Sequence, residues 1–150
     1  MDWIQEAKRQ FNRPKPTHFT NYRHCCECAE HDATLLAYDV NSIGVEQLGN
    51  PGWDPLCFTS AEGLLYYLPA LIRLTLETMD TPQEQYLEQL LFHLLYDGPE
   101  NRIVRACNPE QRAFIAGFLM YLMEQYSVEI DEGIFRADDM LKAYAIWDAR

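Results

Sequence analysis

Apolar residues recur along this chain at intervals of three and four positions, and this spacing predicts a set of amphipathic α-helices. The clearest stripe follows Thr81-Pro82-Gln83-Glu84, where a capping hydroxyl precedes proline and a glutamate stands three positions after the cap. Asp97-Gly98-Pro99 should end this helix. The sequence Asn108-Pro109-Glu110-Gln111 repeats the same start, so we expect another helix from there to about Tyr126. The stripe of the first of these two helices consists of Tyr86, Leu87, Leu90, Leu91, Leu94 and Leu95.

Four further segments have helical spacing. Residues 2–12 place Trp3, Ala7 and Phe11 on one face, and residues 60–77 are apolar on all sides, which indicates a central helix with Pro69 inside it. Each of the other two segments, 21–37 and 137–148, has one apolar face. These faces consist of Tyr22, Cys26, Ala29, Ala33 and Leu36 in the first, and of Met140, Leu141, Tyr144 and Trp147 in the second.

The remaining segments are rich in turn formers. Glycine, proline and asparagine punctuate residues 38–58, which we expect to form an irregular loop, and residues 127–135 could hold one short strand. The longest apolar run, Gly63–Ile72, is too short to cross a membrane, which takes about 20 residues. The pattern therefore predicts an all-α protein, with residues 1–150 forming a single compact domain of about six helices.

The charge is strongly negative. The chain of 150 residues has a formal net charge of −11, which argues against a nucleic-acid or anionic-lipid binder, because such a protein needs a basic face. Residues 1–75 hold 6 basic and 9 acidic side chains, and residues 76–150 hold 6 and 14, so most of the negative charge lies in the second half. Such a field permits a basic protein partner, and it also permits plain solubility.

Acidic residues gather near the C-terminal end, with apolar residues between them. Apolar anchors inside a charged rim are typical of protein interfaces, whereas a charge run on a loop is more often simply solvated. The first interpretation makes the protein a non-enzymatic binding protein that masks a basic partner, most concretely a toxin-neutralising immunity protein. The candidate partner-binding residues are Glu129, Asp131, Glu132, Phe135, Asp138 and Asp139.

The segment His24-Cys25-Cys26-Glu27-Cys28-Ala29-Glu30-His31 is the main chemical candidate. On a helix, His24, Cys28 and His31 lie within about 80° of one another, Cys25 can reach Cys28, and Cys26 points to the opposite, apolar side. Imidazole and thiolate ligands suit zinc, so the first hypothesis is a zinc site made by His24, Cys25, Cys28 and His31.

Two other interpretations of this segment stay open. It could be the exposed polar face of an ordinary helix, or Cys25 and Cys28 could be a redox pair, which is typically preceded by a strand and placed where a helix begins. No such strand is evident before Cys25. The chain has five cysteines, and a polar run rather than a signal peptide follows Met1, so we expect reduced thiols in a cytoplasm. No motif of a nucleophilic, phosphate-binding or zinc-protease site occurs, and we assign no catalytic residue.

One stretch resembles a known family. The run from Phe58 to Ala70, Phe-Thr-Ser-Ala-Glu-Gly-Leu-Leu-Tyr-Tyr-Leu-Pro-Ala, is similar to a hallmark of the DUF6714-like proteins, small bacterial proteins of unknown function. The His24–His31 segment and the Gly49–Pro55 turn also resemble features of bacterial relatives. The resemblance implies a bacterial, cytosolic protein and no established reaction, so it transfers no catalytic residue.

Overall fold

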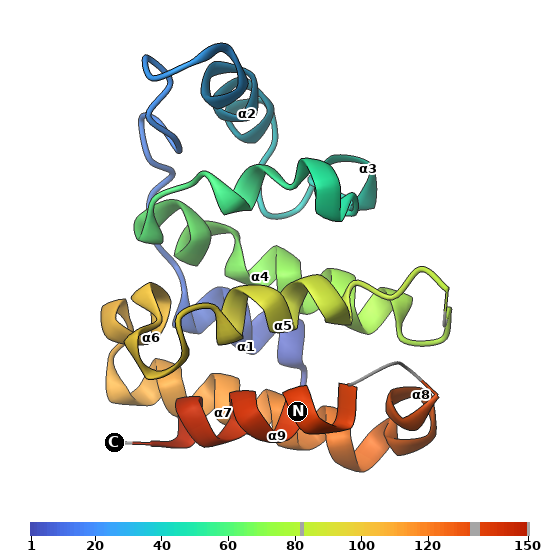
Figure 1. Ribbon diagram of the computed structural model, residues 1–150. Coiled ribbons are helices and arrows are strands. Elements are labelled where there is room, and N and C mark those ends of the chain that lie inside the picture. Colours follow the sequence, from blue (N-terminus) through green and yellow to red (C-terminus); the bar gives the residue numbers. More distant parts are fainter. Residues whose placement is uncertain (82, 133–135, 150) are drawn as a thin grey trace. The chain divides into compact units, whose positions relative to one another are not determined.

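The computed structural model describes residues 1–81, 83–132 and 136–149, and all regular secondary structure in them is helical (Figure 1). The all-α prediction is confirmed, although the helices outnumber the six expected because residues 38–58, 98–106 and 127–131 contain short helices. No described helix has both the length and the apolar character that a membrane crossing requires. The α-helices are α1 (Trp3–Gln10), α2 (Cys26–Ala37), α3 (Val45–Leu48), α4 (Ala61–Thr78), α5 (Leu87–Leu95), α6 (Arg102–Ala106), α7 (Pro109–Gln125), α8 (Ser127–Asp131) and α9 (Arg136–Asp148), and the 3-10 turns are η1 (Pro51–Trp53), η2 (Pro55–Cys57) and η3 (Gly98–Glu100).

The chain divides into two compact units, residues 2–74 and residues 75–150, the latter together with Met1. Helix α4 runs through the division, since it spans Ala61–Thr78. We describe each unit by itself. That the whole chain forms one domain stays a prediction.

In the first unit, α2 begins later than its sequence predicts and buries a different face. The helix starts at Cys26 rather than near Asn21, because Cys25 has an extended backbone (φ −162°, ψ 172°) and its sulfur accepts a hydrogen bond from the N–H of Cys28. The expected apolar face is wrong: Cys26 is exposed. The buried residues instead follow helical spacing on the other side, as Cys28, His31, Asp32 and Leu35.

Hydrogen bonds from side chains to the backbone connect the elements of this unit. The Tyr67 hydroxyl donates to the carbonyls of Leu35 and Tyr38, which holds the C-terminal end of α2 beside α4. Near the start of α4, the Thr59 hydroxyl donates to the carbonyl of Phe19. A Cβ atom at Gly63 would lie 2.1 Å from that hydroxyl oxygen, so glycine is required for this approach.

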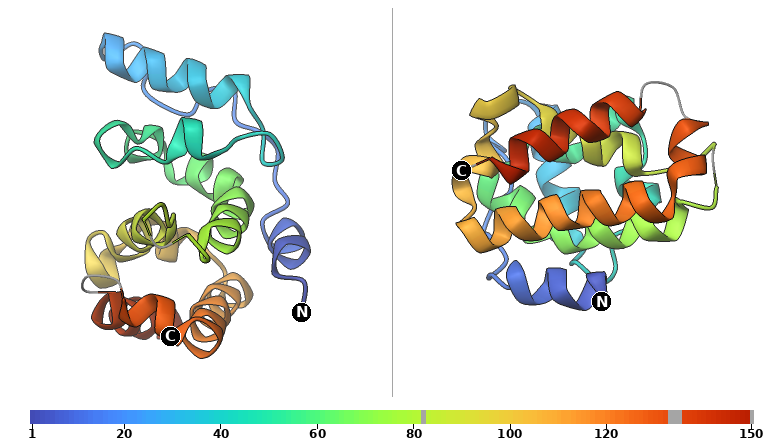
Figure 2. Two further views of the ribbon diagram at one scale, coloured as in Figure 1. Left: turned by 90° about the vertical axis from the view of Figure 1, so that its right-hand side faces the viewer. Right: turned by 90° about the horizontal axis from the view of Figure 1, so that it is seen from below.

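The second unit is built on α5, α7 and α9. Helix α9 packs against both α5 and α7, and the views in Figures 1 and 2 show α7 and α9 side by side. Trp147 of α9 is buried and donates its indole N–H to the carbonyl of Leu94 at 3.1 Å. The inner face of α9 includes Met140, as expected, whereas Leu141 is 60% exposed. The capping box at Asn108 is confirmed, with both of its reciprocal hydrogen bonds to Gln111.

Two further sequence-based expectations fail in this unit. The helix predicted to start at Thr81 starts only at Leu87, because the Thr78 hydroxyl accepts from the N–H of Tyr86 and the Gln85 side chain donates to the carbonyl of Met79. These hydrogen bonds fold the segment between α4 and α5 back on itself before α5 begins. Pro82, the predicted first helical residue, lies outside the described residues. The short strand considered for residues 127–135 is also wrong over its described part, where Ser127–Asp131 is helix α8.

Candidate metal centre

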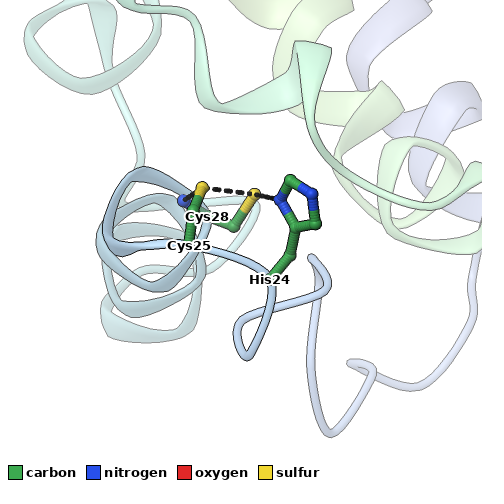
Figure 3. A group of neighbouring side chains, drawn as sticks. All are labelled: His24, Cys25 and Cys28. Carbon is green, nitrogen blue, oxygen red and sulfur yellow. Dashed lines mark hydrogen bonds between the residues drawn. The ribbon is translucent and has the colours of Figure 1, made fainter.

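Three potential metal-ligand atoms, two sulfurs and one imidazole nitrogen, converge at the start of α2. His24, Cys25 and Cys28 each offer one atom, and these atoms lie within 4.8 Å of one another (Figure 3). The sulfurs of Cys25 and Cys28 are 3.3 Å apart, and Nδ1 of His24 is 3.6 Å from the Cys28 sulfur. The hydrogen bond from the N–H of His24 to the carbonyl of Asn21 closes the turn that places the imidazole there.

These separations are close to those that a tetrahedral zinc ion imposes. With Zn–S near 2.3 Å and Zn–N near 2.0–2.1 Å, ligand atoms around zinc lie about 3.8 Å apart for two sulfurs and about 3.6 Å apart for sulfur and nitrogen. The pair of His24 and Cys28 matches the second value, and the two cysteines need to separate by only about 0.5 Å. Small side-chain rotations would therefore admit the ion.

The two thiols differ in how readily they ionise. Hydrogen bonds from the backbone N–H of Cys28, from the Cys28 side chain and from His24 lower the pKa of Cys25 from an ordinary 9.0 to about 7. The hydrogen bond with Cys25 raises the pKa of Cys28, and burial adds to this effect. Cys25 is exposed and Cys28 is buried, so the thiol that ionises more readily is also the accessible one.

Asp32 anchors the loop that precedes the site. Its buried carboxylate accepts hydrogen bonds from the backbone N–H groups of Phe19 (2.6 Å) and Thr20 (3.1 Å), and it lies 2.7 Å from Nδ1 of His18. Burial raises the pKa of Asp32, but these hydrogen bonds outweigh burial and hold the pKa below its usual range. The Thr20 hydroxyl in turn donates to the carbonyl of Cys28 at 2.6 Å, which connects the anchored loop to a ligand residue.

His31 lies apart from the three ligand atoms. Its imidazole is fully buried, with its ring centre 4.7 Å from that of Phe58 and 4.5 Å from that of Trp53. Neither ring nitrogen makes a hydrogen bond within the described part of the chain, and Nε2 is 3.7 Å from a carboxylate oxygen of Glu27. The structure thus groups three of the four predicted ligands and places the fourth in an aromatic contact.

The predicted acidic residues lie on α8, at its C-cap (Glu132) and on α9, and the two helices pack against each other. Asp131, Glu132 and Asp138 are exposed, and Glu129 and Asp139 are half-buried. Phe135 and Ile134 lie outside the described residues, and Ile130 is buried. Two apolar side chains that the sequence did not single out as interface residues are exposed on the same helices, Val128 at 62% and Leu141 at 60%.

Comparison with protein families gives one result. Residues 21–148 match the model of the family of unknown function DUF6714. The chain belongs to DUF6714. The matched span contains both the His24–His31 segment and the Phe58–Ala70 run that carried the resemblance. Comparison with curated proteins found no match, and comparison with solved structures found none. The function of this DUF6714 protein must therefore be argued from its site.

Proposed function

We propose that this protein binds zinc through Nδ1 of His24 and the sulfurs of Cys25 and Cys28. The observation that supports this proposal is the convergence of these three atoms within 4.8 Å of one another, with the Cys28 sulfur 3.3 Å from that of Cys25 and 3.6 Å from Nδ1 of His24, both close to the edges of a zinc tetrahedron. Three protein ligands leave one coordination position for water or for an incoming group, which is the arrangement of zinc sites that exchange ligands.

The donor set and its surroundings favour zinc over harder cations. Thiolate and imidazole ligands select zinc or copper(I), whereas magnesium and calcium take oxygen ligands. The net charge of −11 attracts any cation towards the protein. None of the five cysteines takes part in a disulfide, which suits the reducing cytoplasm in which we place the protein.

The test is a zinc titration of tag-free, reduced protein, together with elemental analysis of the protein as purified. We expect one zinc per chain, and single changes of Cys28→Ser or Cys25→Ser should weaken binding by at least about tenfold. Cys26→Ser is the matched control, because Cys26 is exposed, adjoins Cys25 and is not one of the converging atoms. Equal loss in all three variants, or no stoichiometric binding, would contradict the proposal.

A second proposal concerns the acidic residues of α8 and α9, which we infer to be a surface for a basic protein partner, such as a toxin that this protein would neutralise as an immunity protein. Exposed Val128 and Leu141 on the same two helices support it, because apolar side chains among charges are typical of interfaces. Complementary charge would speed capture of the basic partner.

This second proposal has its own test. A pull-down at low salt should recover one basic protein in stoichiometric amount. Charge reversal at Asp131, Glu132 and Asp138, which are exposed, should weaken that binding and flatten its salt dependence. Affinity that is unchanged by the reversal would remove this surface from the proposal.

A further inference from the structure

The two cysteines of the candidate centre form a pair that is suited to a second chemistry. Cys25 caps α2 from an extended conformation, and Cys28 occupies the first turn, so the helix begins at the pair. Their sulfurs are 3.3 Å apart, and closing to a disulfide bond of about 2.05 Å requires a movement of only about 1.2 Å. A redox pair typically follows a strand and stands where a helix begins; the structure places this pair at the start of a helix, and no strand precedes it in the described residues.

We propose that Cys25 and Cys28 form a reversible disulfide by exchange with a small disulfide such as glutathione disulfide, and that this disulfide excludes zinc from the centre. The second half of this inference rests on the proposed zinc binding, since it requires both sulfurs to be ligands. The first half depends only on the two sulfurs.

Exposure assigns the two roles in the exchange. Cys25 is exposed, so its thiolate can attack one sulfur of glutathione disulfide and form a mixed disulfide while one glutathione thiolate leaves. Cys28 is buried beside it and then attacks the Cys25 sulfur, which releases the second glutathione. The net reaction converts one dithiol and one glutathione disulfide into one protein disulfide and two glutathione molecules. The two protons of the protein thiols end on the two glutathione thiols.

Neighbouring cysteines define the competing outcomes. Cys26 is exposed and adjacent, and Cys57 is exposed in η2, so an unselective oxidation would modify either of them as readily as Cys25. The hydrogen bond from the N–H of Cys28 to the Cys25 sulfur, at 3.4 Å, holds the Cys25 side chain over the first turn of α2. The structure therefore favours the linkage between Cys25 and Cys28 over the linkage between Cys25 and Cys26.

The test equilibrates metal-free protein in glutathione buffers, traps free thiols by alkylation and maps the modified peptides by mass spectrometry. The reaction releases two glutathiones, so the oxidised fraction should rise from about one tenth to about nine tenths as the ratio of [GSSG] to [GSH]² increases about eightyfold. Cys28→Ser should stop at the mixed disulfide on Cys25, whose amount follows the ratio of [GSSG] to [GSH] instead. Cys26→Ser should oxidise like the wild type.

A second arm repeats the titration with zinc present. Zinc bound to the thiolates should raise the glutathione ratio at half-oxidation by the factor 1 + [Zn]/Kd, and each disulfide formed should release one zinc to a chromogenic indicator. An oxidation curve that zinc does not shift would overturn the proposal that the disulfide excludes zinc, and it would leave the proposal of a Cys25–Cys28 disulfide standing. A Cys25–Cys26 linkage, or mixed disulfides alone in the wild type, would overturn the disulfide itself and leave zinc binding standing.

Discussion

The dependence of zinc affinity on pH tests the unequal thiols directly. Zinc binds thiolates, so protons compete with the metal at each sulfur, and affinity rises with pH until the thiol is already ionised in the free protein. Hydrogen bonds from Cys28 and His24 lower the pKa of Cys25 to about 7. The hydrogen bond with Cys25, together with burial, raises the pKa of Cys28. Above pH 7, most of the remaining competition therefore comes from Cys28.

The magnitude follows from these two directions. Between pH 7 and pH 8, loss of the Cys28 proton accounts for an increase in affinity of about tenfold, and Cys25, already half ionised at pH 7, adds only about twofold. We therefore expect an increase of about twentyfold over this interval. If both thiols had ordinary pKa values near 9, the same interval would give about eightyfold to ninetyfold.

The assay is competition with a chromophoric zinc chelator of known pH dependence, at constant ionic strength and with a phosphine reductant that contains no thiol. Cys26→Ser should reproduce the wild-type profile. An increase near ninetyfold would refute the stabilised Cys25 thiolate while keeping both cysteines as ligands. An affinity that does not change with pH would refute thiolate coordination altogether.

Three further predictions concern the packing around the centre. Asp32→Ala should lower the free energy of unfolding by about 2–5 kcal/mol, since it leaves two buried backbone N–H groups without their acceptor. The control, Glu30→Ala on the exposed side of α2, should change it by less than about 0.5 kcal/mol. Chemical denaturation measures both variants, and equal effects would contradict the anchoring role of Asp32. Because folding lowers the pKa of Asp32, the ionised carboxylate is the form that stabilises the fold. Its contribution to stability should therefore be complete above the pKa that Asp32 has in the unfolded chain, about 4, and should be lost as the pH falls below that value and through the lower pKa of the folded protein. Gly63→Ala should destabilise by about 1–3 kcal/mol, despite the better helix propensity of alanine, because its Cβ would displace the hydroxyl of Thr59; an unchanged melting temperature would speak against this close contact. His31→Phe should raise the free energy of unfolding by about 1–3 kcal/mol, because the buried ring nitrogens of His31 have no hydrogen-bond partner within the described residues. The same variant should leave zinc affinity unchanged, because His31 is not one of the three converging residues. Loss of zinc binding in this variant would instead identify His31 as a ligand.

The helical class of the fold was predictable because apolar spacing and caps act locally. The capping box at Asn108 and the stop at Asp97-Gly98-Pro99 both work as the sequence indicates, with Asp97 in the left-handed region at φ 67°. Thr81 failed as a helix start because Thr78 and Gln85, whose hydrogen bonds run to Tyr86 and to Met79, satisfy backbone groups in another way. A capping motif states a local preference, which such bonds can override.

The candidate centre was predictable in its composition and less so in its geometry. A helical wheel drawn through His24 assumed a helix that begins before it, and the extended backbone of Cys25 moves His24 off that wheel. The buried face of α2 was misassigned because it carries His31 and Asp32, polar residues that hydrophobic spacing assigns to solvent. Asp32 does stand four positions after Cys28, a signal that would have found the anchor once Cys28 was placed in the first turn.

The most direct test of the proposed centre is X-ray absorption spectroscopy of the zinc-loaded, reduced protein, which reports the kind and distance of the atoms bound to the metal. The three converging atoms predict two sulfurs at about 2.3 Å, with nitrogen or oxygen at about 2.0–2.1 Å completing the shell. Cys28→Ser should remove one sulfur from that shell, and Cys26→Ser should remove none. A coordination shell that contains no sulfur, or a shell that consists of four sulfurs, would contradict a zinc centre made by His24, Cys25 and Cys28.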